Sequence, residues 1–137
     1  MHAGRLLHNG QAVDVEVWHC ESFLERALGL MGHAPLRDAL ALRITRCRAI
    51  HTFGLDYDID AIFTDRDGRV LRCLRALPPR SVALQPGAHA AWEMRAGLAS
   101  VLGVEAGSTL MLAGELGAAQ LSQPRSGQRR SGQRRST

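Results

Sequence analysis

Side chains suited to chemistry are concentrated in residues 47–73, where a histidine is followed by three acids spaced two apart. Asp56, Asp58 and Asp60 have the acid spacing with which an EF-hand calcium loop begins. Such a loop needs glycine at its sixth position and glutamate at its twelfth, and this chain has alanine and aspartate there. The flanking residues instead alternate as in a strand, which predicts that the three carboxylates share one face. Because like charges on one face repel, we expect paired arginines or a weakly bound divalent ion among them, or a catalytic role for one carboxylate.

His51 is expected on the same strand face as Cys47 and Phe53, because even numbers of residues separate them. One interpretation is a half-buried histidine bonded to the backbone or to an acid. The other is a pocket histidine whose partner is Asp60 or Glu93, and which binds a ligand or moves a proton near neutral pH. Zinc would require three or four ligands, and the histidines and cysteines follow no zinc spacing. Neither a metal nor a cofactor is therefore expected.

Two further charged residues could serve a site. Arg26 lies in a predicted helix, where it either pairs with a neighbouring glutamate at the surface or binds an acidic group through its planar guanidinium. Glu93 follows Trp92 in a predicted strand, so if Trp92 fills the core, Glu93 is exposed or lines a cleft. Nucleophilic catalysis has little support, because there is no G-x-S-x-G elbow and Cys47 would lie about 13 Å from His51 along a strand.

Strands are the elements that would position these side chains. Residues 12–18 alternate between valine and acidic residues, which favours a strand with one wet face. The pairs Asn9-Gly10 and Asp67-Gly68 indicate hairpins, because glycine adopts a positive φ without penalty. Three further segments are each predicted to place a set of side chains on one face: Leu40, Leu42 and Ile44; Cys47, Ala49, His51 and Phe53; Tyr57, Ile59, Ala61 and Phe63.

Helical signals are few. Ser22 with Glu25 three residues later is a capping-box pattern, and it predicts a short helix over about residues 22–30. Residues 96–103 are predicted to form one or two helical turns. We therefore predict a mainly β fold, a jelly-roll-like β-sandwich or barrel of about seven or eight short strands with one short helix.

Composition limits the classes of function. The chain has 137 residues and a net charge of +4, but five arginines lie after Gln120, and the remaining twelve face thirteen acids. The folded body therefore has no electrostatic footprint for nucleic acid. Residues 120–137 contain the repeat SGQRR and are expected to form a disordered, arginine-rich tail after a single domain over 1–119. No leader or membrane span is recognised, and three cysteines form no C-x-x-C pair, so a cytoplasmic protein is expected.

Four segments carry a family resemblance, in the order ERALGLMG, IHTFGLDYDIDAIFTDRDGRVL, ALPPR and WEMRAGLASVLGVEAGSTLML. Together they resemble the DUF192 (UPF0127) family over roughly residues 12–113. Asp58 stands where the family usually has proline, and Leu55 where methionine is common. The resemblance implies a mainly β, jelly-roll-like sandwich and no established function.

We expect a binding module for a small polar or anionic ligand or a protein partner. Its candidate groove would be lined by Arg26, His51, Thr52, Asp60 and Glu93. An alternative is a small hydrolase or lyase that uses His51 with Asp60 or Glu93 as an acid–base pair, although no catalytic constellation is recognisable. A third possibility is a structural or oligomeric module without a ligand.

Overall fold

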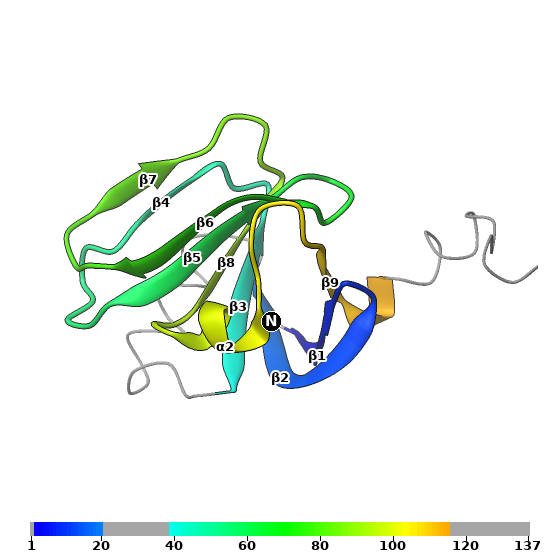
Figure 1. Ribbon diagram of the computed structural model, residues 1–137. Helices are drawn as coiled ribbons and strands as arrows, with labels where there is room; N and C mark the ends of the chain where they lie inside the picture. Colours follow the sequence, from blue (N-terminus) through cyan, green and yellow to red (C-terminus); the bar gives the residue numbers. More distant parts are fainter. Residues whose placement is uncertain (1, 21–38, 116–137) are drawn as a thin grey trace, which may run out of the picture.

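The computed structural model describes residues 2–20 and 39–115, and within them the protein is mainly β (Figure 1). The described part contains nine strands, the short helix α2 (Leu98–Leu102) and the 3-10 turn η1 (Ala113–Glu115). The helix predicted over 22–30, with Arg26, and the predicted tail over 120–137 lie outside the described residues. The strands are β1 (His2–His8), β2 (Gln11–Cys20), β3 (Leu40–Thr45), β4 (Ala49–His51), β5 (Ile59–Thr64), β6 (Val70–Leu77), β7 (Val82–Leu84), β8 (Ala90–Arg95) and β9 (Leu110–Leu112).

Seven strands form one sheet in the order β6-β5-β8-β3-β2-β1-β9, and β4 and β7 form a second sheet of two strands. Neighbouring strands are antiparallel except β2 and β3, which run parallel. The edges β6 and β9 approach each other through an isolated bridge between Arg69 and Thr109, and neither sheet closes into a barrel. Among the described residues, no helix is long and apolar enough to cross a membrane.

Both predicted hairpin turns are present. Asn9 and Gly10 connect β1 to β2 with φ of 53° and 82°, as a type I′ turn requires. At the turn between β5 and β6, the Gly68 N–H donates to the Asp65 carbonyl at 3.0 Å. Gly68 has φ 84°, and a Cβ there would lie 2.7 Å from the carbonyl oxygen of Leu110. This glycine is therefore needed both for its backbone conformation and for the close approach of β9.

The period-two pattern correctly assigns most core faces. Leu42 and Ile59 lie in one apolar cluster, on the side of the large sheet that the β4–β7 sheet covers through Ile50. On the other side, Ile62 and Trp92 belong to a second cluster, to which α2 also contributes. The central strands β5 and β8 are thus buried on both faces.

The D-x-D-x-D prediction is wrong. β5 begins at Ile59, so Asp56 and Asp58 lie in the preceding loop and are exposed, whereas Asp60 is fully buried on the strand. The strand itself does not extend upstream of Ile59, so Asp56 and Asp58 lie in a loop and face solvent, while Leu55 and Tyr57 pack partly against the same apolar cluster as Ile59.

Candidate functional site

Asp60 is a buried carboxylate whose oxygens accept three backbone hydrogen bonds. Its Oδ2 accepts from the N–H groups of Gly97 at 3.0 Å and Ala99 at 2.9 Å, and its Oδ1 accepts from the N–H of Ala76 at 2.9 Å. Helix α2 has no capping side chain of its own, so Asp60 caps it from a distant strand. A carboxylate is well suited to this position, because the first amides of a helix have no intrahelical acceptor.

The third of these bonds fixes a bulge in β6. The register between β5 and β6 shifts opposite Asp60, and Ala76 adopts φ 54° there. Beside it, Arg75 Nη2 donates to the Val104 carbonyl at 2.8 Å, which ties the bulge to the chain that follows α2. Asp60 and Arg75 thus join three segments that are far apart in the sequence.

Glu93 points to the opposite side of the large sheet from Asp60. It pairs with Ala61 and Leu42, which belong to the cluster between the two sheets, whereas Asp60 pairs with Met94 in the other cluster. Glu93 is fully buried, and so is the adjacent Trp92. The prediction that burial of Trp92 leaves Glu93 exposed or beside a cleft is wrong, because β8 is a central strand with both faces covered.

His51 lies on the outside of the β4–β7 sheet. It pairs with Val82 and is exposed, while its neighbour Ile50 is buried toward the large sheet. Its Nδ1 accepts a hydrogen bond from the N–H of Phe53 at 3.3 Å, and the two rings lie 5.7 Å apart between centroids. The β4–β7 layer and the large sheet therefore separate this imidazole from the Asp60 carboxylate.

Thr52 is fully buried and links β4 to the loop after β6. Its hydroxyl donates to the Pro78 carbonyl at 2.7 Å and accepts from the Ser81 N–H at 2.8 Å. The structure therefore does not bring the described candidate residues into one groove: Thr52 and Asp60 are bonded to backbone, Glu93 lies between the sheets and His51 faces outward. Their roles in ligand binding stay a prediction.

Sequence patterns missed an exposed apolar surface beside His51. The side chains of Val82 and Leu84 are 62% and 61% exposed, and Phe53 is 54% exposed. Val82 and Leu84 alternate around the buried Ala83, so the signal was a short period-two run, V-A-L, that was too brief to identify a strand. We call the four exposed side chains of His51, Phe53, Val82 and Leu84 the outer face.

Cys73 on β6 is half-buried, and burial raises the pKa of its thiol above the usual value. The Arg75 guanidinium opposes this shift by hydrogen bonding and charge, and the charge of Asp60 adds to it. The thiol is therefore a weaker nucleophile than an exposed cysteine. In the described ranges, no group of three histidine, cysteine or acidic side chains is arranged to hold a metal ion.

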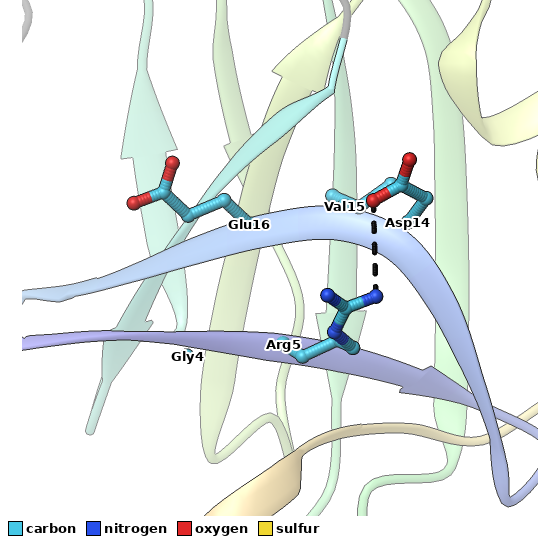
Figure 2. A pocket seen from close by; sticks show the side chains of 5 residues that line it. All are labelled: Gly4, Arg5, Asp14, Val15 and Glu16. Carbon is cyan, nitrogen blue, oxygen red and sulfur yellow. Dashed lines mark ion pairs between the residues drawn. The ribbon is translucent and has the colours of Figure 1, made fainter.

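Two hollows on the described surface have a charged lining. The first, of about 470 Å³, is lined by Gly4, Arg5, Asp14, Val15 and Glu16. Figure 2 shows Arg5 of β1 directed toward Asp14 of β2, with the ion pair spanning 3.7 Å. Both partners are well exposed, so the pair contributes little to stability, and Asp14 already neutralises the cation.

The second hollow, of about 500 Å³, has a different lining. It is formed by Arg46, Arg48, Arg66, Gly87, Ala88 and His89. No local sequence pattern indicates it, because its arginines come from two separate connections between strands and its histidine from a third.

Comparisons with known proteins agree on the family and the fold. A model of the DUF192 family, described as an uncharacterized ACR, matches residues 5–112. A crystal structure of a Sinorhizobium meliloti 1021 protein, described as a "putative transcription regulator", superposes with a TM-score of 0.70 at 21% identity, over 82% of this chain and 95% of the other. A protein of unknown function from Novosphingobium aromaticivorans DSM 12444 gives a TM-score of 0.66 at 21% identity, over 80% of this chain and 83% of the other. No curated protein matches the chain.

Proposed function

The chain belongs to the DUF192 family, whose function is not established, and we propose that it is a binding module that docks a protein partner on the outer face. The observation that carries this proposal is the exposure of Val82 and Leu84 beside His51 on the β4–β7 sheet, with Phe53 exposed in the turn that follows β4. Scattered apolar residues are normal on protein surfaces, but a contiguous apolar group is typical of an interaction site.

A protein suits this surface better than a small molecule does. Small-ligand sites are concave, whereas Val82 and Leu84 are more than half exposed on the outside of a two-stranded sheet. The composition also fits, because aromatic residues are enriched and charged residues depleted at the centre of protein interfaces. Arg72 of β6 donates to the Leu84 carbonyl at 3.2 Å and is thus bonded to the backbone of β7.

The exposed area is sufficient to support specific binding. Complete burial of a valine, leucine or phenylalanine side chain contributes about 1.5–3 kcal/mol, so completing the burial of a side chain that is about 60% exposed contributes about 1–2 kcal/mol. The three apolar residues together would supply about 3–5 kcal/mol before the costs of association. They could therefore act as the energetic centre of a moderate-affinity interface.

The alternative functions are less well supported. A hydrolase or lyase that pairs His51 with Asp60 or Glu93 needs hydrogen-bond contact between those side chains, and they face different directions. An oligomeric module would use the outer face to bind a second copy of the chain, and sedimentation distinguishes this from a different partner.

Three further expectations are part of the proposal. A jelly-roll-like architecture is supported by the packing of the β4–β7 sheet on one face of the large sheet. A single domain over residues 1–119, followed by a tail, is supported by the position of the family match at residues 5–112. The expectation of a cytoplasmic location rests on the sequence alone.

Site-specific photo-cross-linking tests the proposal. A photoreactive amino acid at position 82 should capture one defined protein in cells, and the same amino acid at position 101 is the control. Val101 is 73% exposed on α2, away from the outer face, so the two sites match in exposure and side-chain type. Equal or absent capture at the two positions would contradict the proposal, and capture of the chain itself would identify a self-association surface.

A further inference from the structure

We propose that the arginine-lined hollow, formed by Arg46, Arg48, Arg66 and His89 with the turn at Gly87 and Ala88, binds a small polyvalent oxyanion that carries phosphate or carboxylate groups. This site is separate from the outer face and does not depend on the function proposed for it.

Three connections between strands build the hollow. Arg46 and Arg48 lie between β3 and β4, Arg66 lies in the β5–β6 turn, and His89 lies between β7 and β8. Figure 1 shows these connections meeting at one end of the β4–β7 layer. The arrangement collects three guanidinium groups from residues that are up to 20 positions apart in the sequence.

Backbone hydrogen bonds hold the walls in place. The His89 carbonyl accepts from the Cys47 N–H at 3.2 Å, and the His89 N–H donates to the Thr64 carbonyl at 2.7 Å. The Arg48 carbonyl accepts from the Gln85 N–H at 2.8 Å. The backbone under the cationic side chains is therefore preorganised, which lowers the entropic cost of binding a ligand.

The turn that carries Arg66 is also fixed. Asp65 Oδ1 accepts from the N–H groups of Asp67 and Arg69, both at 2.9 Å. The carboxylate of Asp65 is thus occupied within its own turn, and no acidic residue is among those that line the hollow. Arg46 itself adopts φ 55°, a left-handed conformation that is uncommon for a residue other than glycine.

No described side chain pairs with a charge of the hollow. Within residues 2–20 and 39–115, the side chains of Arg46, Arg48, Arg66 and His89 form no ion pair and no side-chain hydrogen bond. Three like charges around one concave space repel each other, and an anion relieves that repulsion. The planar fork of arginine donates two parallel hydrogen bonds to a carboxylate or a phosphate.

The size of the hollow favours a small molecule over an inorganic phosphate ion alone. Ligand sites of about 300–1,000 Å³ accommodate whole metabolites, and this hollow of about 500 Å³ lies within that range. The ligand class is therefore a small molecule with at least two negative charges.

Calorimetric titration of the full chain with pyrophosphate and with citrate tests this site and separates phosphate from carboxylate ligands. Because five arginines after Gln120 also attract anions, binding must be assigned through variants. We expect Arg48→Gln and Arg66→Gln each to weaken binding of the preferred anion about tenfold at about 0.15 M salt. Arg80→Gln is the matched control, because Arg80 is exposed like Arg48 and Arg66 but lies on the connection between β6 and β7 and does not line the hollow.

The arginine Nε–Hε NMR signals provide a second readout that does not depend on the affinity of the tail. The signal missing from the spectrum of Arg48→Gln or Arg66→Gln assigns that arginine in the wild-type spectrum. Both assigned signals should shift when the anion is added to the wild type. The proposal is overturned if neither anion binds, if Arg80→Gln weakens binding as much as the other two variants, or if a single-stranded oligonucleotide binds these arginines more tightly than either small anion does.

Discussion

Replacement of the buried Asp60 should lower the free energy of unfolding far more than replacement of the exposed Asp58 does. In Asp60→Ala, the N–H groups of Ala76, Gly97 and Ala99 lose their acceptor; the Ala99 amide is buried, and the bonds of the other two are part-buried. An unsatisfied buried amide costs about 1–3 kcal/mol, and partial relaxation of the short helix reduces the sum. We therefore expect the free energy of unfolding to fall by about 3–5 kcal/mol, which is a large fraction of the stability of a small domain.

Asp60→Asn separates hydrogen bonding from shape. The amide group of asparagine has an accepting oxygen on one side and a donating NH₂ group on the other, so its oxygen could accept from Gly97 and Ala99 while its NH₂ group faces the Ala76 N–H. Because one pair of donors then face each other, we expect a smaller loss of about 2–3 kcal/mol. Asp58→Asn is the matched control, since Asp58 is exposed and should change stability by less than about 0.5 kcal/mol.

Urea denaturation measures these losses, and hydrogen exchange locates them. The amides of Ala76, Gly97 and Ala99 should exchange faster in Asp60→Asn than in the wild type, while those of the distant β1–β2 hairpin should not change. If Asp60→Asn is as stable as the wild type, or if it accelerates exchange uniformly, then Asp60 does not organise α2 and the β6 bulge.

Three further predictions concern single residues. Gly68→Ala should cost about 2–4 kcal/mol in urea denaturation, because its Cβ would meet the Leu110 carbonyl, whereas Gly10→Ala, with open space around it, should cost about 1 kcal/mol; equal costs would contradict the steric argument. Thr52→Val should lower the unfolding free energy by about 1–3 kcal/mol, because the lost hydroxyl of the buried Thr52 serves two part-buried backbone groups; an unchanged midpoint would show that those groups find other partners. Because its pKa is raised, the Cys73 thiol should be alkylated only at higher pH than in the urea-unfolded chain. The protonated thiol's contribution to stability is complete below the unfolded-state pKa and should be lost as the pH rises through the folded-state pKa. Mass spectrometry that finds equal alkylation rates of Cys73 in the folded and unfolded states would refute this.

Local patterns were sufficient to predict both hairpins and the core faces of β3 and β5, but the face predicted for Cys47, His51 and Phe53 is wrong, because Cys47 is buried and the two rings are exposed. The Asn9-Gly10 and Asp67-Gly68 turns follow from the φ angles that these residues tolerate, and both are confirmed. The predicted face of Ile59, Ala61 and Phe63 is confirmed as well, since all three lie in one apolar cluster. A one-residue slip in register would have moved all three to the other side of the sheet.

The site could not be derived in the same way, because it depends on which faces are covered. An alternating strand indicates two sides, but it does not reveal that both sides of β8 are buried, and so Glu93 was expected near the surface. Asp60 illustrates the same limit: its partners Gly97 and Ala99 lie 37 and 39 residues later, and no local pattern connects a strand acid with a helix start at that distance. The arginines of the hollow are likewise brought together only by topology.

The central claim, that the outer face binds a protein, is tested most directly by the dissociation constant of the partner captured at position 82. Val82→Asp combined with Leu84→Asp should weaken that complex about 30- to 1,000-fold, since each side chain contributes about 1–2 kcal/mol. The thermal unfolding midpoint should change little, because both side chains are more than half exposed. A dissociation constant that the double variant leaves unchanged, or that Val101→Asp raises equally, would contradict the assignment of this surface.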